Sequence, residues 1–304
     1  MIQFHVDVDN LWIYENEYGL QPSRQTSCMY GEALPRLLDI FNEKNIKATF
    51  FLVGTDLEDK CSKDFCVEAL RQGHEMANHT FSHREDFFKL SPADKEYEII
   101  KCQDMIAQTT GRKPKGFRAP GYYLDRDIVE LLIKHNYAYD SSILPSCANV
   151  LMKPYIQIMS KKRLNKSFGR IRHLFASREI TRYASLSARG SLLECPISVS
   201  PFFRLPIHST FIFLCGRTYF KMTFYLLKAF KPKNIVYLLH GLDAFELKGL
   251  AHEQVVPTLR VPLERRLSIL REIIDQLMRI DQVATTESLL SFINPQTIRQ
   301  SRAI

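Results

Sequence analysis

The sequence is poor in several features that would place it in a specialised class. It has no internal repeat and no low-complexity tract, and its 304 residues contain one tryptophan, Trp12. The apolar stretch 207–230 is interrupted by Arg217 and Lys221, so it falls short of the roughly 20 uninterrupted apolar residues of a membrane span. With 45% hydrophobic and 24% charged residues, the composition is typical of a soluble globular protein with a substantial core.

Disulfide and export signals are also missing. The 7 cysteines form no CxxC pair, and their odd number argues against a disulfide framework. The first candidate motif begins within seven residues of Met1, which leaves no room for a cleavable export segment. We therefore expect a reducing, cytoplasmic location, with the protein attached peripherally to the inner face of the cytoplasmic membrane for the reason given next.

Acidic residues are nearly absent from residues 151–190. This stretch has ten Lys and Arg residues against Glu179 alone, a local charge of +9 within a net charge of +8. Such a block is typical of phosphate recognition, on lipid or nucleic acid, although a solvated insertion without a partner has the same composition. Aromatic residues are widely spaced in it, so we expect no nucleic acid. Binding of an anionic membrane surface through 151–190 is the prediction, because 207–230 can add apolar contact.

The amino-terminal strand pattern carries two carboxylates. Asp7 and Asp9 stand one residue apart, and side chains at i and i+2 of a strand point to the same face. Two crowded carboxylates repel each other unless a cation or a proton lies between them. An exposed acidic turn is the alternative for Asp7 and Asp9 taken alone.

Two histidines provide the partners that such a carboxylate requires. His79 and His83 are four residues apart, which in a helical turn places both imidazoles on one face. Two imidazoles and one carboxylate form a catalytic site for zinc or a similar divalent ion. Asp9, His79 and His83 supply that set, and Asp7 is then available as a base.

Further polar residues follow predicted strands. Arg118 precedes the turn Pro120-Gly121-Tyr122, Asp140 ends a short strand, and His240 ends a buried strand. Catalytic residues at the carboxyl ends of several strands are typical of a β/α barrel.

Strand and helix patterns alternate along much of the chain. We expect strands at 3–8, 48–53, 75–77, 115–118, 137–139, 192–199, 235–239 and 282–285, and helices at 31–44, 63–71, 93–109, 125–134, 261–278 and 287–292. The alternation predicts a parallel sheet. Residues 207–230 are expected to form a core strand followed by an amphipathic helix. One catalytic domain, 1–304, would carry a basic and amphipathic insertion at about 145–232.

The order of these motifs resembles the polysaccharide deacetylase superfamily. The resemblance covers roughly residues 2–142 and 192–294, and it implies a distorted (β/α) barrel and metal-dependent N-deacetylation. Residues matching the family pattern imply Asp9, His79 and His83 as metal ligands, Asp7 as base, Arg118 as the residue that orients it, and His240 as general acid. Asp140 would assist His240, and Pro120, Gly121, Tyr122 and Trp12 would contact the substrate.

Two departures from the family pattern affect these assignments. Val8 separates Asp7 from Asp9, so base and ligand could be exchanged, and no tryptophan is near Asp140. The Asp-Val-Asp variant is similar to branches that act on lipid-linked sugars. We therefore expect a hydrolase that removes an N-acyl group, acetyl by preference, from a polyprenyl-phosphate-linked amino sugar. Zinc is the default cofactor, with Co²⁺, Ni²⁺ or Mn²⁺ compatible. The alternatives are deacetylation of a soluble or polymeric sugar, deformylation of a lipid-linked sugar, and non-catalytic carbohydrate or lipid binding.

Overall fold

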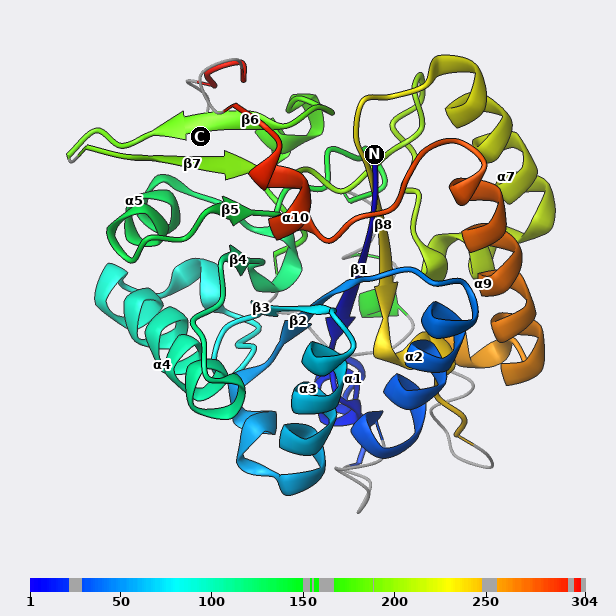
Figure 1. Ribbon diagram of the computed structural model, residues 1–304, viewed down its shortest axis with the longest axis horizontal. Coiled ribbons are helices and arrows are strands. Elements are labelled where there is room, and N and C mark those ends of the chain that lie inside the picture. Colours follow the sequence, from blue (N-terminus) through cyan, green and yellow to red (C-terminus); the bar gives the residue numbers. More distant parts are fainter. Residues whose placement is uncertain are drawn as a thin grey trace.

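The architecture is a curled, mostly parallel sheet surrounded by helices (Figure 1). The computed structural model describes residues 1–21, 29–149, 154, 156–158, 167–187, 189–247, 256–294 and 298–301. In the described residues the sheet has the order β6-β7-β5-β4-β3-β2-β1-β8. All neighbouring strands are parallel except the β6–β7 pair, which is antiparallel. The strands are β1 (Ile2–Val8), β2 (Thr49–Leu52), β3 (Glu75–Asn78), β4 (Gly116–Phe117), β5 (Tyr139–Asp140), β6 (Thr181–Ala184), β7 (Ser191–Glu194) and β8 (Ile235–His240).

The central strand β1 is buried along its whole length. It pairs with β2 on one side and with β8 on the other, and residue 7 of β1 lies opposite residue 240 of β8. Because parallel strands end at the same edge of a sheet, the residues after β1, β3, β4 and β8 gather on one side of the molecule.

The gap between β7 and β8 is bridged by irregular chain. The Ser198 N–H donates to the Val236 carbonyl at 3.1 Å, and His208 forms a parallel bridge with Leu238. These contacts join the two ends of the sheet into a distorted barrel. The fold class predicted from the sequence is therefore confirmed.

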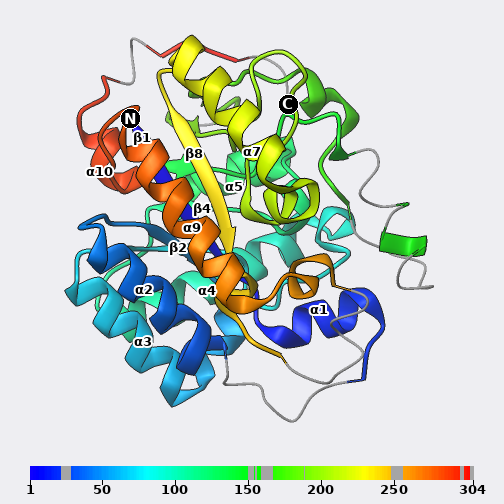
Figure 2. The ribbon, with the colours of Figure 1, turned by 90° about the vertical axis from the view of Figure 1, so that its right-hand side faces the viewer.

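Helices cover the outer faces of the sheet. Each of α2, α3, α5 and α9 buries an apolar face, and together with the strands they form the core. Figures 1 and 2 both show α7 beside α9, on the right in Figure 1 and facing the viewer in Figure 2. The main helices are α1 (Leu11–Tyr18), α2 (Leu34–Glu43), α3 (Lys60–Arg71), α4 (Pro92–Thr110), α5 (Arg126–Lys134), α7 (Ser209–Phe230), α9 (Leu263–Met278) and α10 (Thr286–Ser291). No helix in the described part of the chain combines the length and the apolar character needed to cross a bilayer.

The structure corrects three local expectations. Residues 207–230 were predicted to form a core strand followed by a helix, but α7 already begins at Ser209 and is kinked at Gly216. The predicted strand 282–285 is reduced to one isolated bridge between Val283 and Ile2. Within the predicted insertion, β6 forms a hairpin with β7 that the charge-rich sequence did not indicate. Much of the predicted basic block, including Lys161, Lys162 and Arg163, lies outside the described residues.

Candidate metal centre and its cavity

Three buried side chains converge at the carboxyl ends of β1 and β3. The ligand atoms of Asp9, His79 and His83 all lie within 4.8 Å of one another. Asp9 Oδ1 is 3.4 Å from His79 Nε2 and 3.4 Å from His83 Nε2. This oxygen is buried without a hydrogen-bond partner, a costly arrangement unless a cation neutralises it. The donor set and its geometry therefore fit a divalent metal ion.

The backbone around the two histidines is irregular. We predicted a helical turn, but residues 79–83 form a loop in which Thr80 has φ 69° and His83 has φ 45°. The Thr80 N–H donates to Asn78 Oδ1 at 2.8 Å, which stabilises this turn. The two imidazoles therefore meet because the chain reverses direction after β3, and not because they share one face of a helical turn.

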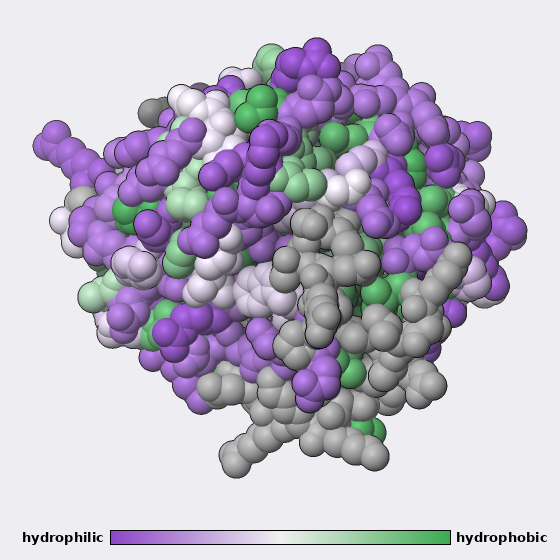
Figure 3. All heavy atoms as spheres, turned by 90° about the horizontal axis from the view of Figure 1, so that it is seen from below, coloured by the Kyte–Doolittle hydropathy of each residue, from purple (hydrophilic) through white to green (hydrophobic). Residues whose placement is uncertain are grey.

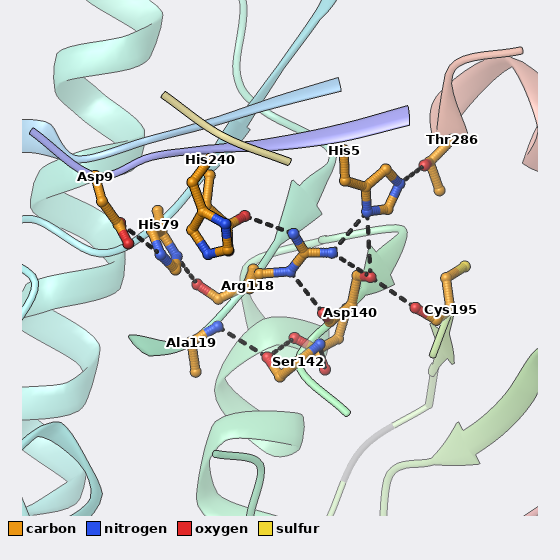
Figure 4. A network of polar contacts seen from close by, with 12 residues as sticks. His5, Asp9, His79, Arg118, Ala119, Asp140, Ser142, Cys195, His240 and Thr286 are labelled. Carbon is orange, nitrogen blue, oxygen red and sulfur yellow. Dashed lines mark hydrogen bonds and ion pairs between the residues drawn. The ribbon is translucent and has the colours of Figure 1, made fainter. Parts of the chain in front are cut away.

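The tautomer of His79 follows from its hydrogen bond. His79 Nδ1 lies 2.7 Å from the Arg118 carbonyl oxygen, which can only accept (Figure 4). Nδ1 must therefore carry the proton, and the lone pair of Nε2 faces Asp9. A backbone carbonyl in this role is common behind metal-binding histidines.

Asp7 and Arg118 form a buried ion pair beside this cluster. Arg118 Nη1 donates to Asp7 Oδ1 at 2.5 Å, and both side chains are nearly inaccessible to solvent. The guanidinium also donates from Nε to the Ser141 carbonyl at 2.8 Å and lies over the Phe51 ring at 4.1 Å. Asp9 thus lies with the histidines and Asp7 with the arginine.

His5 completes this network, although it was not predicted as a site residue from the sequence. Arg118 Nη2 donates to His5 Nδ1 at 2.6 Å, so the other nitrogen, Nε2, carries the proton and donates to Thr286 Oγ1 at 2.6 Å (Figure 4). Burial and the Arg118 charge lower the pKa of His5 well below its ordinary value, which keeps the ring neutral. The available signal was its position two residues before Asp7, on the same face of β1.

His240 ends β8 directly opposite Asp7. Its backbone N–H donates to Asp243 Oδ2 at 2.8 Å, and the His208 ring lies 6.3 Å away between centroids. His208 was not predicted as a site residue. Burial and the neighbouring His240 lower the pKa of His208 to about 3.

Asp140 does not assist His240 as predicted. Its carboxylate accepts from the Ser142 N–H at 3.0 Å and from Ser142 Oγ at 2.6 Å, and that hydroxyl accepts from the Ala119 N–H at 2.8 Å. Asp140 therefore supports the turn after β4. The carboxylate closest in sequence to His240 is Asp243, and it bonds to the backbone N–H of His240 rather than to the imidazole.

A cavity of about 630 Å³ opens at the Asp7, Asp9, His79, His83 and His240 side chains. Gly121 and Tyr122 line it, as predicted, whereas Pro120 and Trp12 do not. Trp12 borders a neighbouring hollow of about 270 Å³, which shares Glu17 and His83 with the cavity, and its indole N–H donates to Asp56 Oδ1 at 3.0 Å. Figure 3 shows the side of the molecule at which β1 and β8 end, where apolar residues lie among polar ones.

Comparison with known proteins identifies the domain. The family model described as Polysaccharide deacetylase matches residues 28–139, which include both histidines and Arg118. The chain carries a polysaccharide deacetylase domain.

Curated relatives match this domain and its surroundings in part. A peptidoglycan deacetylase of Helicobacter pylori is 30% identical over 149 residues, 47% of this chain and 50% of that protein. A peptidoglycan-N-acetylglucosamine deacetylase of Bacillus cereus is 33% identical over 89 residues, 29% of this chain and 31% of that protein. The matches thus span half or less of these relatives.

A solved structure supports the fold of the polysaccharide deacetylase domain over the whole chain. A protein from Mycobacterium smegmatis, assigned to the polysaccharide deacetylases, superposes with a TM-score of 0.63 at 17% identity. The superposition covers 100% of this chain and 93% of that one. At this identity the likeness concerns the fold alone.

Proposed function

We propose that the protein is a metal-dependent hydrolase that removes an N-acyl group, acetyl in the simplest case, from an amino sugar. The observation that carries this proposal is the convergence of Asp9, His79 and His83 beside the Asp7–Arg118 pair, at the end of a large cavity. A bound divalent ion would supply Lewis-acid chemistry toward the amide carbonyl. Zinc fits the two-imidazole, one-carboxylate set, and cobalt, nickel and manganese use similar donors.

The side chains divide the remaining work. Asp7, held by Arg118, takes the proton from the attacking water. The Tyr122 N–H, in the turn that lines the cavity, donates to the developing oxyanion. His240, opposite Asp7 in the β1–β8 register, protonates the departing amine.

The finer proposal is that the sugar is linked through phosphate to a polyprenyl lipid and is met at the cytoplasmic face of a membrane. Apolar residues in the cavity and the basic residues of 151–190 support it. Removal of an acetyl group from a sugar polymer is the second candidate, favoured by what the Helicobacter and Bacillus relatives are named for.

Metal analysis and substrate assays test these proposals separately. His79→Ala and His83→Ala protein should lose a stoichiometry of about one divalent ion per chain. Full metal content in both variants would overturn the ligand assignment. Mass spectrometry of sugars incubated with the enzyme should show loss of one acyl group, and comparing lipid-linked sugars with chitooligosaccharides decides between the two substrates.

A further inference from the structure

Most of the residues that line the cavity are apolar, and we distinguish a polar end from this apolar part. The polar end contains the candidate catalytic groups described above. The apolar part is built from the chain around 144–148, residues 205–206, the start of α7 and the region 256–258. Its aliphatic and aromatic side chains include Leu144, Ile156, Leu205, Phe211, Leu214 and Val256.

Such a lining is unsuited to further sugar rings. A sugar brings several hydroxyl groups, and each one that leaves water without a hydrogen-bond partner is unfavourable. The side chains of Leu144, Leu205 and Leu214 offer no partner. The polar side chains in these segments are few; they include Thr210, Thr258 and Asn149, whose amide already donates to the Leu144 carbonyl at 2.9 Å. An alkyl chain has no such requirement and gains free energy from the same contact.

The apolar wall is held in place by specific contacts. The His208 side chain caps α7 by accepting from the Phe211 N–H at 3.4 Å, and the Tyr219 hydroxyl donates to the Pro206 carbonyl at 2.7 Å. His208 itself is joined to β8 through its bridge with Leu238. The wall is therefore fixed relative to His240, which ends β8.

We infer that this part of the cavity is a subsite for an alkyl chain carried by the substrate. The chain is either the acyl group of the scissile amide or the lipid attached to the sugar. Both are alkyl chains and have the same chemistry. The polar end and the apolar part belong to one cavity, so a chain can extend from the first into the second. This inference rests on the proposed function, because it places the amide between Asp7 and His240.

The test measures binding of two ligand series to the full chain by calorimetry, below the micelle concentration. One series is the methyl, butyl and hexyl glycosides of N-acetylglucosamine. The other is methyl glucosaminide carrying N-acetyl, N-butanoyl and N-hexanoyl groups. Each methylene that leaves water should tighten binding about fourfold, so four or more should give roughly 100-fold or better. The series that shows the effect identifies the source of the chain.

A matched pair of variants on α7 locates the subsite. Leu214 and Met222 are both exposed apolar residues, at 51% and 43%, but only Leu214 lines the cavity. Leu214→Glu should abolish most of the chain-length effect and leave the methyl glycoside unaffected. Met222→Glu should bind both series as wild type does. Ala148→Phe, which fills the cavity from another segment, should act like Leu214→Glu.

The outcomes separate this inference from the proposed function. Equal affinity along both series, or an effect lost in Met222→Glu and kept in Leu214→Glu, would overturn the subsite. A chain-length effect that follows the variants as expected, in a protein that hydrolyses none of the ligands, would support the subsite and count against the hydrolase proposal alone.

Discussion

His5 Nδ1 accepts a hydrogen bond from Arg118 Nη2 at 2.6 Å, and this contact restricts how the guanidinium can face Asp7. The neutral ring donates a hydrogen bond from Nε2 to Thr286 Oγ1, at the amino-terminal end of α10. Residues from both ends of the chain therefore orient one arginine. His5 is not among the residues that line the cavity, and it acts as a positioning residue for the candidate base.

Replacing His5 by Leu should lower kcat about 10- to 100-fold, because one hydrogen bond to a charged group contributes roughly 1.5–3 kcal/mol. KM and metal content should change little. His5→Asn places an acceptor near the position of Nδ1 and should recover much of the loss. Steady-state kinetics and metal analysis of the two variants check this. Equal damage in both would assign His5 to packing alone.

Asp7 and Asp9 should respond differently to the same change. Asp7→Asn should nearly abolish turnover and keep the metal, since the side-chain amide of asparagine cannot take a proton from water. Asp9→Asn should lose metal, because it removes the single carboxylate among the three ligands. Metal content measured alongside turnover checks both variants, and an exchange of phenotypes would exchange the two roles.

The sequence predicted most of this framework because the relevant signals are local. The alternation of strands and helices, and polar residues at strand ends, need only nearby residues to be recognised. Asp9, His79 and His83 were assigned as ligands on this basis, and the structure brings them together. The boundaries of β1, β8, α4 and α5 were also close to those observed.

What the sequence did not reveal depends on tertiary contact. The carboxylate that bonds to residue 240 is Asp243, three residues on in a tight turn, and it accepts from the backbone N–H, whereas Asp140 bonds to Ser142. Residues 211–214 are as apolar as a core strand, so their sequence alone does not distinguish strand from helix. Their packing at the start of α7 makes them helical. Trp12 was assigned to the substrate from its residue type, whereas its indole bonds to Asp56 outside the main cavity.

His240→Ala should reduce amide hydrolysis roughly 10²- to 10⁴-fold, the usual contribution of a positioned general acid. In an activated aryl ester of the same acyl group, the aryloxide leaves without protonation. Hydrolysis of that ester should therefore fall much less. Assaying both substrates with one enzyme preparation checks the role. Equal losses on amide and ester would point to a binding role for His240, and near-normal amide turnover would exclude it from the mechanism.

A buried carboxyl pair should make stability depend on pH. Burial raises the pKa of Glu194 well above its ordinary value of 4.5, and the Asp140 charge raises it further. The folded state thus holds a proton that the unfolded chain releases above about pH 4.5. This stabilisation is complete below that pH and declines as pH rises toward the raised pKa, by at most about 1.4 kcal/mol per pH unit.

Glu194→Gln should flatten this dependence above about pH 5. Glutamine stays uncharged and can still accept from the Ile143 N–H, a bond of 3.0 Å in the wild type. Denaturant unfolding at several pH values checks this. The same substitution at Glu32, whose side chain is exposed, is the control. Parallel curves for wild type and Glu194→Gln would contradict the assignment of the bound proton to this pair.

The outer face of α7 should bind an anionic membrane surface. It exposes Tyr225 at 71% and Phe230 at 52%, and the Phe230 ring packs on Phe202 at 4.8 Å. The helix contains no acidic residue, and Lys221 and Lys228 lie among its exposed positions. Apolar contact combined with about 1 kcal/mol for each basic residue near the surface is enough for reversible binding without a span.

Flotation with liposomes measures this binding. Anionic vesicles should carry the protein at low salt and release it as salt rises, because the attraction is screened beyond about 10 Å at 0.1 M. Tyr225→Glu should weaken flotation. The same substitution at Tyr97, a tyrosine of α4 that is 57% exposed, is the control and should not weaken it. Equal partitioning onto neutral and anionic vesicles, with both variants behaving as wild type, would leave α7 without a membrane role. In that case full activity on soluble chitooligosaccharides would favour a polymer as the substrate.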